Sequence, residues 1–263
     1  MSDLAPLLGR TLVIVAHPDD EAGGCGVLMQ RMREPIVLIA TDGAPRGQYF
    51  WGKYGSRDAY AQLRREEARK AATVVGVRQL EFLVSLRTQQ AFVDQELFRA
   101  LPDALRALLE VVDRVRPEAL LTLAYEGGHP DHDCCSFLTH VAARLRLLPA
   151  WEMPLYHRSA AGVSVQQEYG MVSDKGIILQ PTDEELALKQ KMLAAYASQH
   201  HILGLFTSPL ERFRLQPAYD YAQPPHSGTL NYEAWGWSIS GREVSAAFVE
   251  CLRTLSASAA RRP

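Results

Sequence analysis

Hydrophobic positions follow two alternating patterns in the first half of the chain. Short uninterrupted apolar runs predict strands over residues 11–16, 36–41, 77–83 and 118–124, because a strand buried on both faces is apolar at consecutive positions. Between them lie segments with helical spacing, over residues 57–75 and 134–147 and in the stripe Leu97, Leu101, Leu105, Leu108, Val112 and Val115. Strands that alternate with helices are typical of a parallel sheet covered by helices.

The pattern changes after Pro149. A strand-rich stretch over residues 151–180 precedes a helix over 183–199, an irregular aromatic loop over 218–237 and a final helix over 242–255. No repeat or low-complexity segment marks a boundary. We therefore expect a single α/β domain over residues 1–263, with a Rossmann-like three-layer core over 11–148 and a C-terminal elaboration over 149–263 that shapes the substrate pocket. Its mostly parallel sheet is expected to carry helices on both faces.

Composition narrows the classes of partner. The chain has 263 residues, 47% hydrophobic and 22% charged, with 28 Lys and Arg against 30 Asp and Glu. These values exclude a disordered chain and argue against nucleic acid or an anionic membrane surface, which require clustered basic residues. No apolar run approaches the roughly 20 residues of a membrane span. Four cysteines without a CxxC pair favour the reducing cytoplasm.

The strongest chemical signal follows the first predicted strand. The run His17-Pro18-Asp19-Asp20-Glu21 places one imidazole and three carboxylates where a strand passes into a helix. Pro18 suits the first helical position, so His17 and Asp20 can converge on one ion while Asp19 points elsewhere and stays free. The alternative is that the three acids only occupy a first helical turn, where the helix dipole favours negative charge.

A related cluster follows the fourth predicted strand, where His129-Pro130-Asp131 is followed by His132. In a sheet of strand order 3-2-1-4 the first and fourth strands are neighbours, and ligands bind in the crevice at their carboxyl ends. Both clusters are therefore expected in one pocket. Two imidazoles and one carboxylate form a three-ligand site typical of catalytic zinc, although such ligands also accept iron, cobalt or manganese.

With these two motifs the sequence resembles the LmbE-like, or PIG-L, family of zinc-dependent N-acetylglucosaminyl deacetylases. Weaker support comes from Thr41-Asp42-Gly43, from Arg64 with Glu67, and from Lys191 with Ser198-Gln199. The resemblance covers about residues 11–148. It implies that His17, Asp20 and His132 bind the metal, that Asp19 is the general base, and that His129 stabilises the oxyanion or acts as an acid.

These roles agree with the chemistry of the residues. Asp19 can take a proton from metal-bound water as that water attacks an acetamide carbonyl, and a protonated His129 would face the developing negative charge. Asp131 can orient one imidazole. Tyr125 either assists, as a Tyr does in one branch of the family, or simply ends the fourth strand. Arg46 either binds substrate beside the crevice or is a solvated loop residue.

The predicted activity is hydrolysis of the acetamide of an N-acetylglucosamine-type sugar or its conjugate, by a cytoplasmic enzyme with one Zn²⁺ or other divalent ion per chain. Members of the family are often homo-oligomers, but the sequence shows no interface signature that would predict the oligomeric state. Alternatives are an amidase of the same family that acts on a thiol conjugate, and a catalytically silent sugar-binding module. A nucleotide-binding oxidoreductase is disfavoured, because Met29 stands where the third glycine of GxGxxG would follow Gly24 and Gly26.

Overall fold

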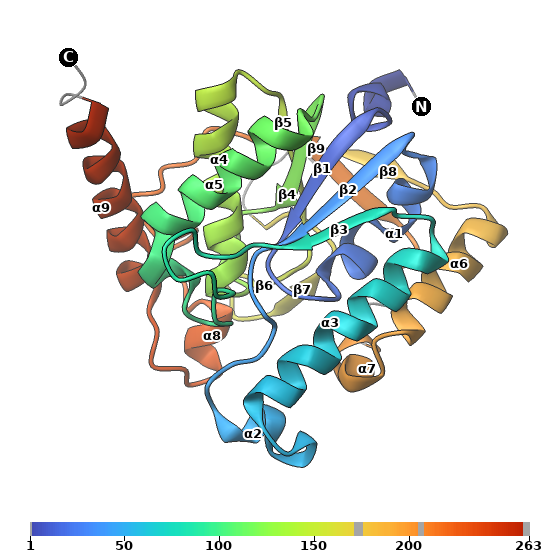
Figure 1. Ribbon diagram of the computed structural model, residues 1–263, viewed down its shortest axis with the longest axis horizontal. Coiled ribbons are helices and arrows are strands. Elements are labelled where there is room, and N and C mark those ends of the chain that lie inside the picture. Colours follow the sequence, from blue (N-terminus) through green and yellow to red (C-terminus); the bar gives the residue numbers. More distant parts are fainter. Residues whose placement is uncertain (1, 171–175, 205–207, 260–263) are drawn as a thin grey trace.

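A computed structural model describes residues 2–170, 176–204 and 208–259. Its main sheet has seven strands in the order β3-β2-β1-β4-β5-β9-β8, and β6 and β7 form a separate hairpin (Figure 1). The strands are β1 (Arg10–Val15), β2 (Glu34–Ile39), β3 (Gln79–Phe82), β4 (Ala119–Leu123), β5 (Ala150–Met153), β6 (Tyr156–Arg158), β7 (Ser164–Gln166), β8 (Ile177–Leu179) and β9 (Glu211–Leu215). The predicted strand order 3-2-1-4 is confirmed.

The first five strands run parallel, whereas β9 and β8 are antiparallel to their neighbours. Val13 of β1 is paired with Val37 of β2 and with Leu121 of β4. All three side chains are fully buried, as expected for central strands of a sheet that is covered on both faces. The predicted mixed but mostly parallel α/β sheet is therefore correct.

Helices cover both faces of this sheet. The α-helices are α1 (Asp20–Arg31), α2 (Gln48–Trp51), α3 (Arg57–Val74), α4 (Leu101–Val115), α5 (Pro130–Arg146), α6 (Asp183–Ala194), α7 (His200–Leu203), α8 (Asn231–Ala234) and α9 (Gly241–Ala259). Short 3-10 helices span Ser2–Leu7, Gly52–Tyr54, Leu97–Ala100 and Ala197–Gln199. In Figure 1, α3 and α6 lie on one side of the strands and α4, α5 and α9 on the other.

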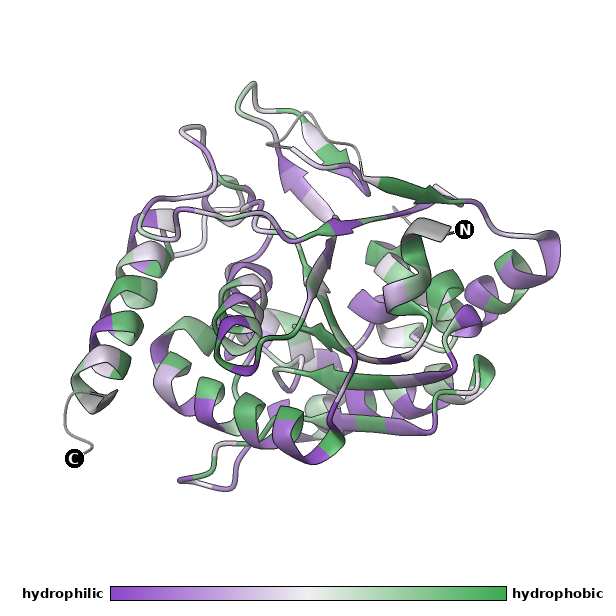
Figure 2. Cartoon of the chain, turned by 90° about the horizontal axis from the view of Figure 1, so that it is seen from above, coloured by the Kyte–Doolittle hydropathy of each residue, from purple (hydrophilic) through white to green (hydrophobic). Residues whose placement is uncertain are grey.

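Hydropathy follows these layers. Figure 2 shows hydrophobic strands in the middle of the protein and hydrophilic residues on the outer sides of the surrounding helices. The leucine stripe that predicted one long helix divides into the 3-10 turn at Leu97–Ala100 and α4, where Pro102 occupies the first turn. Pro tolerates this position because first-turn amides have no intrahelical acceptor. In the described ranges, no helix is long and apolar enough to span a membrane.

The C-terminal part continues the same sheet through β5, β9 and β8. Strand β9 was not predicted, because its sequence ERFRL lacks an apolar run. Two of its charged side chains, Glu211 and Arg214, are nevertheless buried, since each has a partner. Glu211 accepts hydrogen bonds from Lys189 and from the amides of Val27 and Leu28, and Arg214 donates to Glu152. These pairs let a charged strand occupy the interior.

Glycines bring α1 close to the C-terminal part. A side chain at Gly24 would lie 2.7 Å from Met153 Sδ, and one at Gly26 would lie 3.2 Å from Lys189 Cγ. The carbonyl of Gly23 accepts a hydrogen bond from Lys189. These glycines therefore serve helix packing, in agreement with the sequence argument against a dinucleotide-binding loop.

Candidate metal and substrate site

A pocket of about 390 Å³ opens at the carboxyl ends of the parallel strands. Its volume lies within the range of about 300–1,000 Å³ common for small-molecule sites. The lining combines the acids and imidazoles of both motifs with aromatic and aliphatic side chains from later parts of the chain. Among its residues are His17, Asp19, Asp20, Asp94, His129, Phe50, Arg64, Tyr156, Arg158, Ile202, Trp235 and Trp237. The two sequence motifs therefore meet in one pocket, as predicted.

His17 and Asp20, which line this pocket, come together with the buried His132. Asp20 Oδ1 lies 3.3 Å from His132 Nε2, and Asp20 Oδ2 lies 3.5 Å from His17 Nδ1. All three side chains are buried. Asp20 Oδ2 also accepts the amides of Ala16 and His17, at 3.1 and 2.8 Å. The turn after β1 therefore fixes the Asp20 carboxylate and leaves Oδ1 facing His132.

This donor set fits a divalent cation. Among the residues that the structure describes, none forms a hydrogen bond with the buried His132 Nε2, which is costly unless another group occupies that side of the ring. Ring nitrogens of His17, His129 and His132 lie within 4.8 Å of one another. Burial alone would raise the pKa of Asp20, but His132 and His17 outweigh it and hold that pKa well below 3.8. Asp20 is therefore ionised, as a metal ligand must be.

Asp19 points away from Asp20, toward α3. Its Oδ2 lies 3.3 Å from both Nη1 and Nη2 of Arg64, and Arg64 Nη2 also donates to the carbonyl of Pro18 at 2.6 Å. Asp19 has φ of 125°, a strained backbone conformation for a residue with a side chain. Burial raises the pKa of Asp19 to about 6, although Arg64 opposes that rise. Asp19 is thus a carboxylate whose proton affinity suits catalysis near neutral pH.

The loop after β2 supports this arrangement. Gly43 has φ of +64°, and a Cβ there would lie 2.6 Å from Pro18 Cδ and 3.0 Å from Arg64 Nε. A side chain would therefore displace both groups that position Asp19. This contact gives a physical reason for the glycine in Thr41-Asp42-Gly43.

Asp94 is a pocket residue that sequence reasoning missed. Its Oδ1 lies 3.2 Å from His17 Nε2 and 3.5 Å from His129 Nε2, and it is buried without a hydrogen bond from any residue that the structure describes. The only signal was an acid after the short apolar pair Phe92-Val93. Phe92 forms a parallel bridge with Thr41, which carries Asp94 to the same sheet edge as the two motifs.

Asp131 lies beside His17 rather than between the two histidines of its own motif. Its Oδ2 is 3.3 Å from His17 Nε2 and also accepts the amide of Gln95 at 2.6 Å, while Oδ1 accepts the amide of Leu97 at 3.2 Å. The fully buried carboxylate therefore links the loop before α4 to His17. This geometry suits the predicted task of orienting an imidazole.

His129 is a neutral imidazole in this environment. Burial, together with His17 and His132, holds its pKa well below 6.5. As the residue before α5, it accepts the amide of Asp131 on Nδ1 at 3.1 Å. The hydrogen must then reside on Nε2, which faces Asp94. In this environment His129 is a neutral hydrogen-bond donor, the alternative to the protonated imidazole considered from the sequence.

Tyr125 lies outside the pocket lining. Its hydroxyl donates to the carbonyl of Gln223 at 2.7 Å, and its ring packs among Tyr219, Tyr221 and Phe248. Burial raises its pKa far above 10. Tyr125 thus joins β4 to the C-terminal segment, which favours the packing role over the catalytic one.

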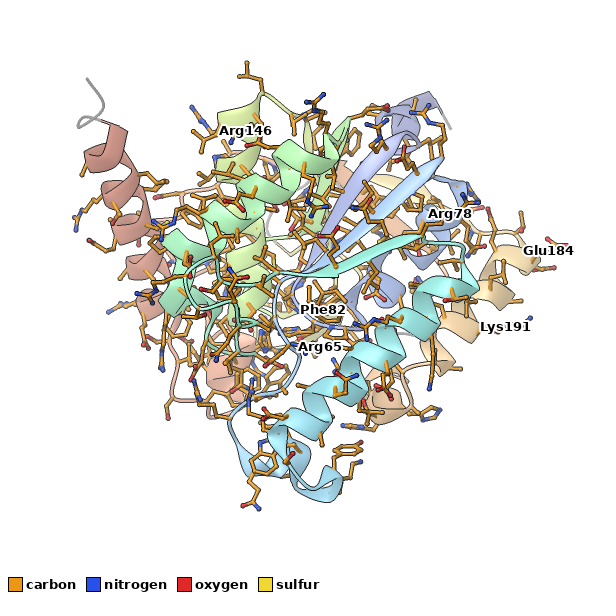
Figure 3. All side chains as sticks on the ribbon, in the orientation of Figure 1. Arg65, Arg78, Phe82, Arg146, Glu184 and Lys191 are labelled. Carbon is orange, nitrogen blue, oxygen red and sulfur yellow. The ribbon has the colours of Figure 1, made fainter. Side chains whose placement is uncertain are left out.

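Arg46 also lies outside this pocket. Its Nε is 2.8 Å from Glu96 Oε1, and 67% of its side chain is exposed. It borders a separate groove between α3 and β3, whose lining includes Arg65 and Phe82 (Figure 3). The place of Arg46 therefore supports the solvated-loop alternative and not the prediction that it binds substrate.

Aromatic residues from the C-terminal half of the chain pack against the histidine cluster. The rings of Trp237 and His129 meet edge to face with centroids 5.1 Å apart, and Trp235 contacts Trp237 at 5.1 Å. Tyr156 packs on His132 at 5.0 Å. Part of the segment predicted as a loop forms the short helix α8. Its tryptophans line the pocket, whereas Tyr219, Tyr221 and Tyr232 are packed away from it.

Comparisons with known proteins agree with this geometry. The PIG-L family, described as GlcNAc-PI de-N-acetylase, matches residues 12–143. A 1D-myo-inositol 2-acetamido-2-deoxy-alpha-D-glucopyranoside deacetylase of Corynebacterium urealyticum is 30% identical, covering 72% of this chain and 70% of the relative. A probable N-acetyl-alpha-D-glucosaminyl L-malate deacetylase 2 of Bacillus subtilis is 29% identical, but over 48% of this chain and 57% of the relative.

Solved structures share the fold at low sequence identity. The A40926 pseudoaglycone deacetylase Dbv21 gives a TM-score of 0.59 at 16% identity, covering 80% of this chain and 99% of the other. The N,N'-diacetylchitobiose deacetylase of Pyrococcus horikoshii gives 0.56 at 19%, covering 79% and 84%. The assignment to a family rests on the PIG-L match over residues 12–143 and on the relative from Corynebacterium urealyticum. This chain belongs to the PIG-L, or LmbE-like, family of deacetylases.

Proposed function

We propose that this protein is a zinc-dependent hydrolase that removes acetyl from an N-acetylglucosamine conjugate. One observation carries the proposal. The buried His132 Nε2 lies 3.3 Å from Asp20 Oδ1 and has no hydrogen-bond partner in the described part of the chain. The carboxylate of Asp19 lines the pocket together with Asp20 but faces Arg64. A metal site and a separate base are the two parts that hydrolysis of an amide at neutral pH requires.

His17, Asp20 and His132 would hold the ion. Two imidazoles and a carboxylate suit zinc and leave room for a further ligand, while iron, cobalt or manganese are chemical alternatives. When bound, such an ion supplies Lewis acidity, which polarises a carbonyl and lowers the pKa of water.

Asp19 and His129 carry out different parts of the proposed reaction. Asp19 takes a proton from the water that attacks the acetamide carbon, and the same proton is available to the departing amine as the C–N bond breaks. His129 donates its Nε2 hydrogen to the developing oxyanion. Asp131 holds His17 in place through Nε2. The products are acetate and the free amino sugar.

The pocket suits a sugar. Trp235, Trp237 and Tyr156 offer rings to the apolar faces of a pyranose, and Asn231 and Gln95 offer amide groups to its hydroxyls. The relatives named for deacetylation of inositol and malate glucosaminides support an N-acetylglucosamine conjugate as substrate.

Acetate release tests this function. The zinc-loaded protein should release acetate from at least one of a panel comprising N,N'-diacetylchitobiose, N-acetylglucosaminyl inositol, N-acetylglucosaminyl L-malate and an N-acetylglucosaminyl glycolipid. Asp19→Asn protein serves as the negative control. Binding without acetate release would favour the silent sugar-binding module. Hydrolysis of a thiol-conjugate amide with no acetate from the sugars would favour the amidase.

A further inference from the structure

The β6–β7 hairpin forms one wall of the catalytic pocket. Arg158 of β6 pairs with Ser164 of β7, and Tyr156 pairs with Gln166. All four residues line the pocket. His157, between Tyr156 and Arg158, is buried on the other face of the strand, where its Nδ1 lies 3.3 Å from Glu126 Oε2. Strand alternation therefore aims Arg158 and Tyr156 at the same space.

Arg158 carries a charge without a partner. Within the described ranges, no carboxylate forms an ion pair with it and its side chain makes no hydrogen bond; its Nε is buried without an acceptor. The other pocket arginine, Arg64, also has a buried Nε without an acceptor, but its terminal nitrogens pair with Asp19 and the Pro18 carbonyl. A buried donor without an acceptor is destabilising unless something else supplies one. In a substrate pocket, a ligand is the natural source.

The guanidinium lies close to the hairpin turn. Gly162 has φ of +82°, and a Cβ there would lie 3.2 Å from Arg158 Nη2. The side chain therefore lies over the turn, on a part of the wall that does not belong to the metal-binding motifs. The planar guanidinium suits a two-point contact with an oxyanion.

We propose that Arg158 binds an oxyanion, a carboxylate or a phosphate, on the part of the substrate attached to the amino sugar. This inference rests on the proposed deacetylase function. An N-acetylated sugar is itself neutral, and its acetamide must reach the cluster formed by His17, Asp20 and His132. The charge that pairs with Arg158 therefore belongs to the rest of the conjugate. The same contact makes Arg158 a determinant of specificity.

Matched glycosides separate charge from shape. Carboxymethyl and 4-carboxyphenyl N-acetylglucosaminides are each compared with their neutral carboxamides, and a 4-phosphonophenyl glycoside distinguishes phosphate-type from carboxylate-type anions. In the zinc-loaded wild type, kcat/KM for at least one anion should exceed that for its carboxamide by about 10-fold or more. Arg158→Gln should abolish that preference by lowering kcat/KM for the anion far more than for its carboxamide, while Arg158→Lys should restore part of it.

Binding measurements on inactive variants test this inference independently of the deacetylase activity. The same glycosides are titrated into Asp19→Asn and into the Asp19→Asn, Arg158→Gln double variant, with affinity read by calorimetry. Tighter binding of the anion that depends on Arg158 supports the inference, whether or not the glycosides are hydrolysed. If none of them is hydrolysed by the zinc-loaded wild type, that result contradicts only the proposed function. Equal affinity for anion and carboxamide, or a preference that survives Arg158→Gln, overturns it.

Discussion

The guanidinium of Arg64 holds one oxygen of Asp19 and leaves the other for the pocket. Both terminal nitrogens of Arg64 lie 3.3 Å from Asp19 Oδ2, and Oδ1 accepts no hydrogen bond from any residue within 2–170, 176–204 and 208–259. Arg64 thereby orients the carboxylate and opposes the rise in pKa that burial causes. The proposed base is thus held by a buried cation from α3 and not by the residues that would bind metal.

Asp19→Asn removes the base and keeps the shape of the side chain. We expect kcat to fall by at least about 100-fold, the usual scale for general-base catalysis. Metal content should stay at one ion per chain, because Asp19 faces Arg64 and not His17 or His132. Elemental analysis and acetate release on the same sample measure both. Asp58→Asn, a change at an exposed residue of α3, is the control. Wild-type activity in Asp19→Asn would exclude Asp19 as the base.

Arg64→Gln should change the pH dependence of the reaction. The pKa of Asp19 is about 6, so kcat/KM should rise with pH as its carboxyl loses a proton. Removing the guanidinium removes a charge that favours the ionised form. The pKa of Asp19 should therefore increase, which shifts the acid limb by about one unit or more toward higher pH. Arg64→Lys keeps the charge and should shift less. An unchanged limb in Arg64→Gln would show that another group controls it.

The sequence predicted the part of the site that strand ends determine. His17 follows the apolar run of β1 and His129 follows that of β4; adjacent parallel strands bring such residues together at one edge. Asp94 was not predicted, because only an isolated β-bridge between Phe92 and Thr41 positions it. A single bridge is too short to produce a periodic hydrophobic pattern in the sequence. Arg158 escaped because nothing in its sequence context shows that its charge lacks a partner.

The fold, like the site, has parts that the sequence predicts and parts that it does not. The core strands were predictable because their apolar runs are buried on both faces. Strand β9 was not, since its burial depends on the pairs Lys189–Glu211 and Arg214–Glu152, whose members are far apart in sequence. Helix α5 starts at Pro130, four residues before the predicted start, because His129 accepts the Asp131 amide and so caps it. These are tertiary or local polar contacts, which the spacing of hydrophobic residues does not reveal.

Gly128→Ala should weaken the wall of the pocket. A Cβ at this position would lie 1.9 Å from the backbone oxygen of Tyr156, so β6 would have to move. We expect the free energy of unfolding to fall by about 1–3 kcal/mol or more, as for other overpacked sites. Urea denaturation measures this loss. Gly52→Ala, whose Cβ would meet only Gln48 Cγ at 3.6 Å, is the control and should stay within about 0.5 kcal/mol. Equal stability of both variants would contradict the predicted clash.

The most direct test of the account is a metal titration with acetate release as the readout. Zinc is added to chelator-treated wild type, to His132→Ala, and to His201→Ala, which alters an exposed histidine of α7. Activity of the wild type and of His201→Ala should rise until one equivalent per chain is bound and then level off, while His132→Ala should stay inactive. Acetate release at the full rate by metal-free wild type, or by His132→Ala, would contradict a metal-dependent deacetylase built on His17, Asp20 and His132.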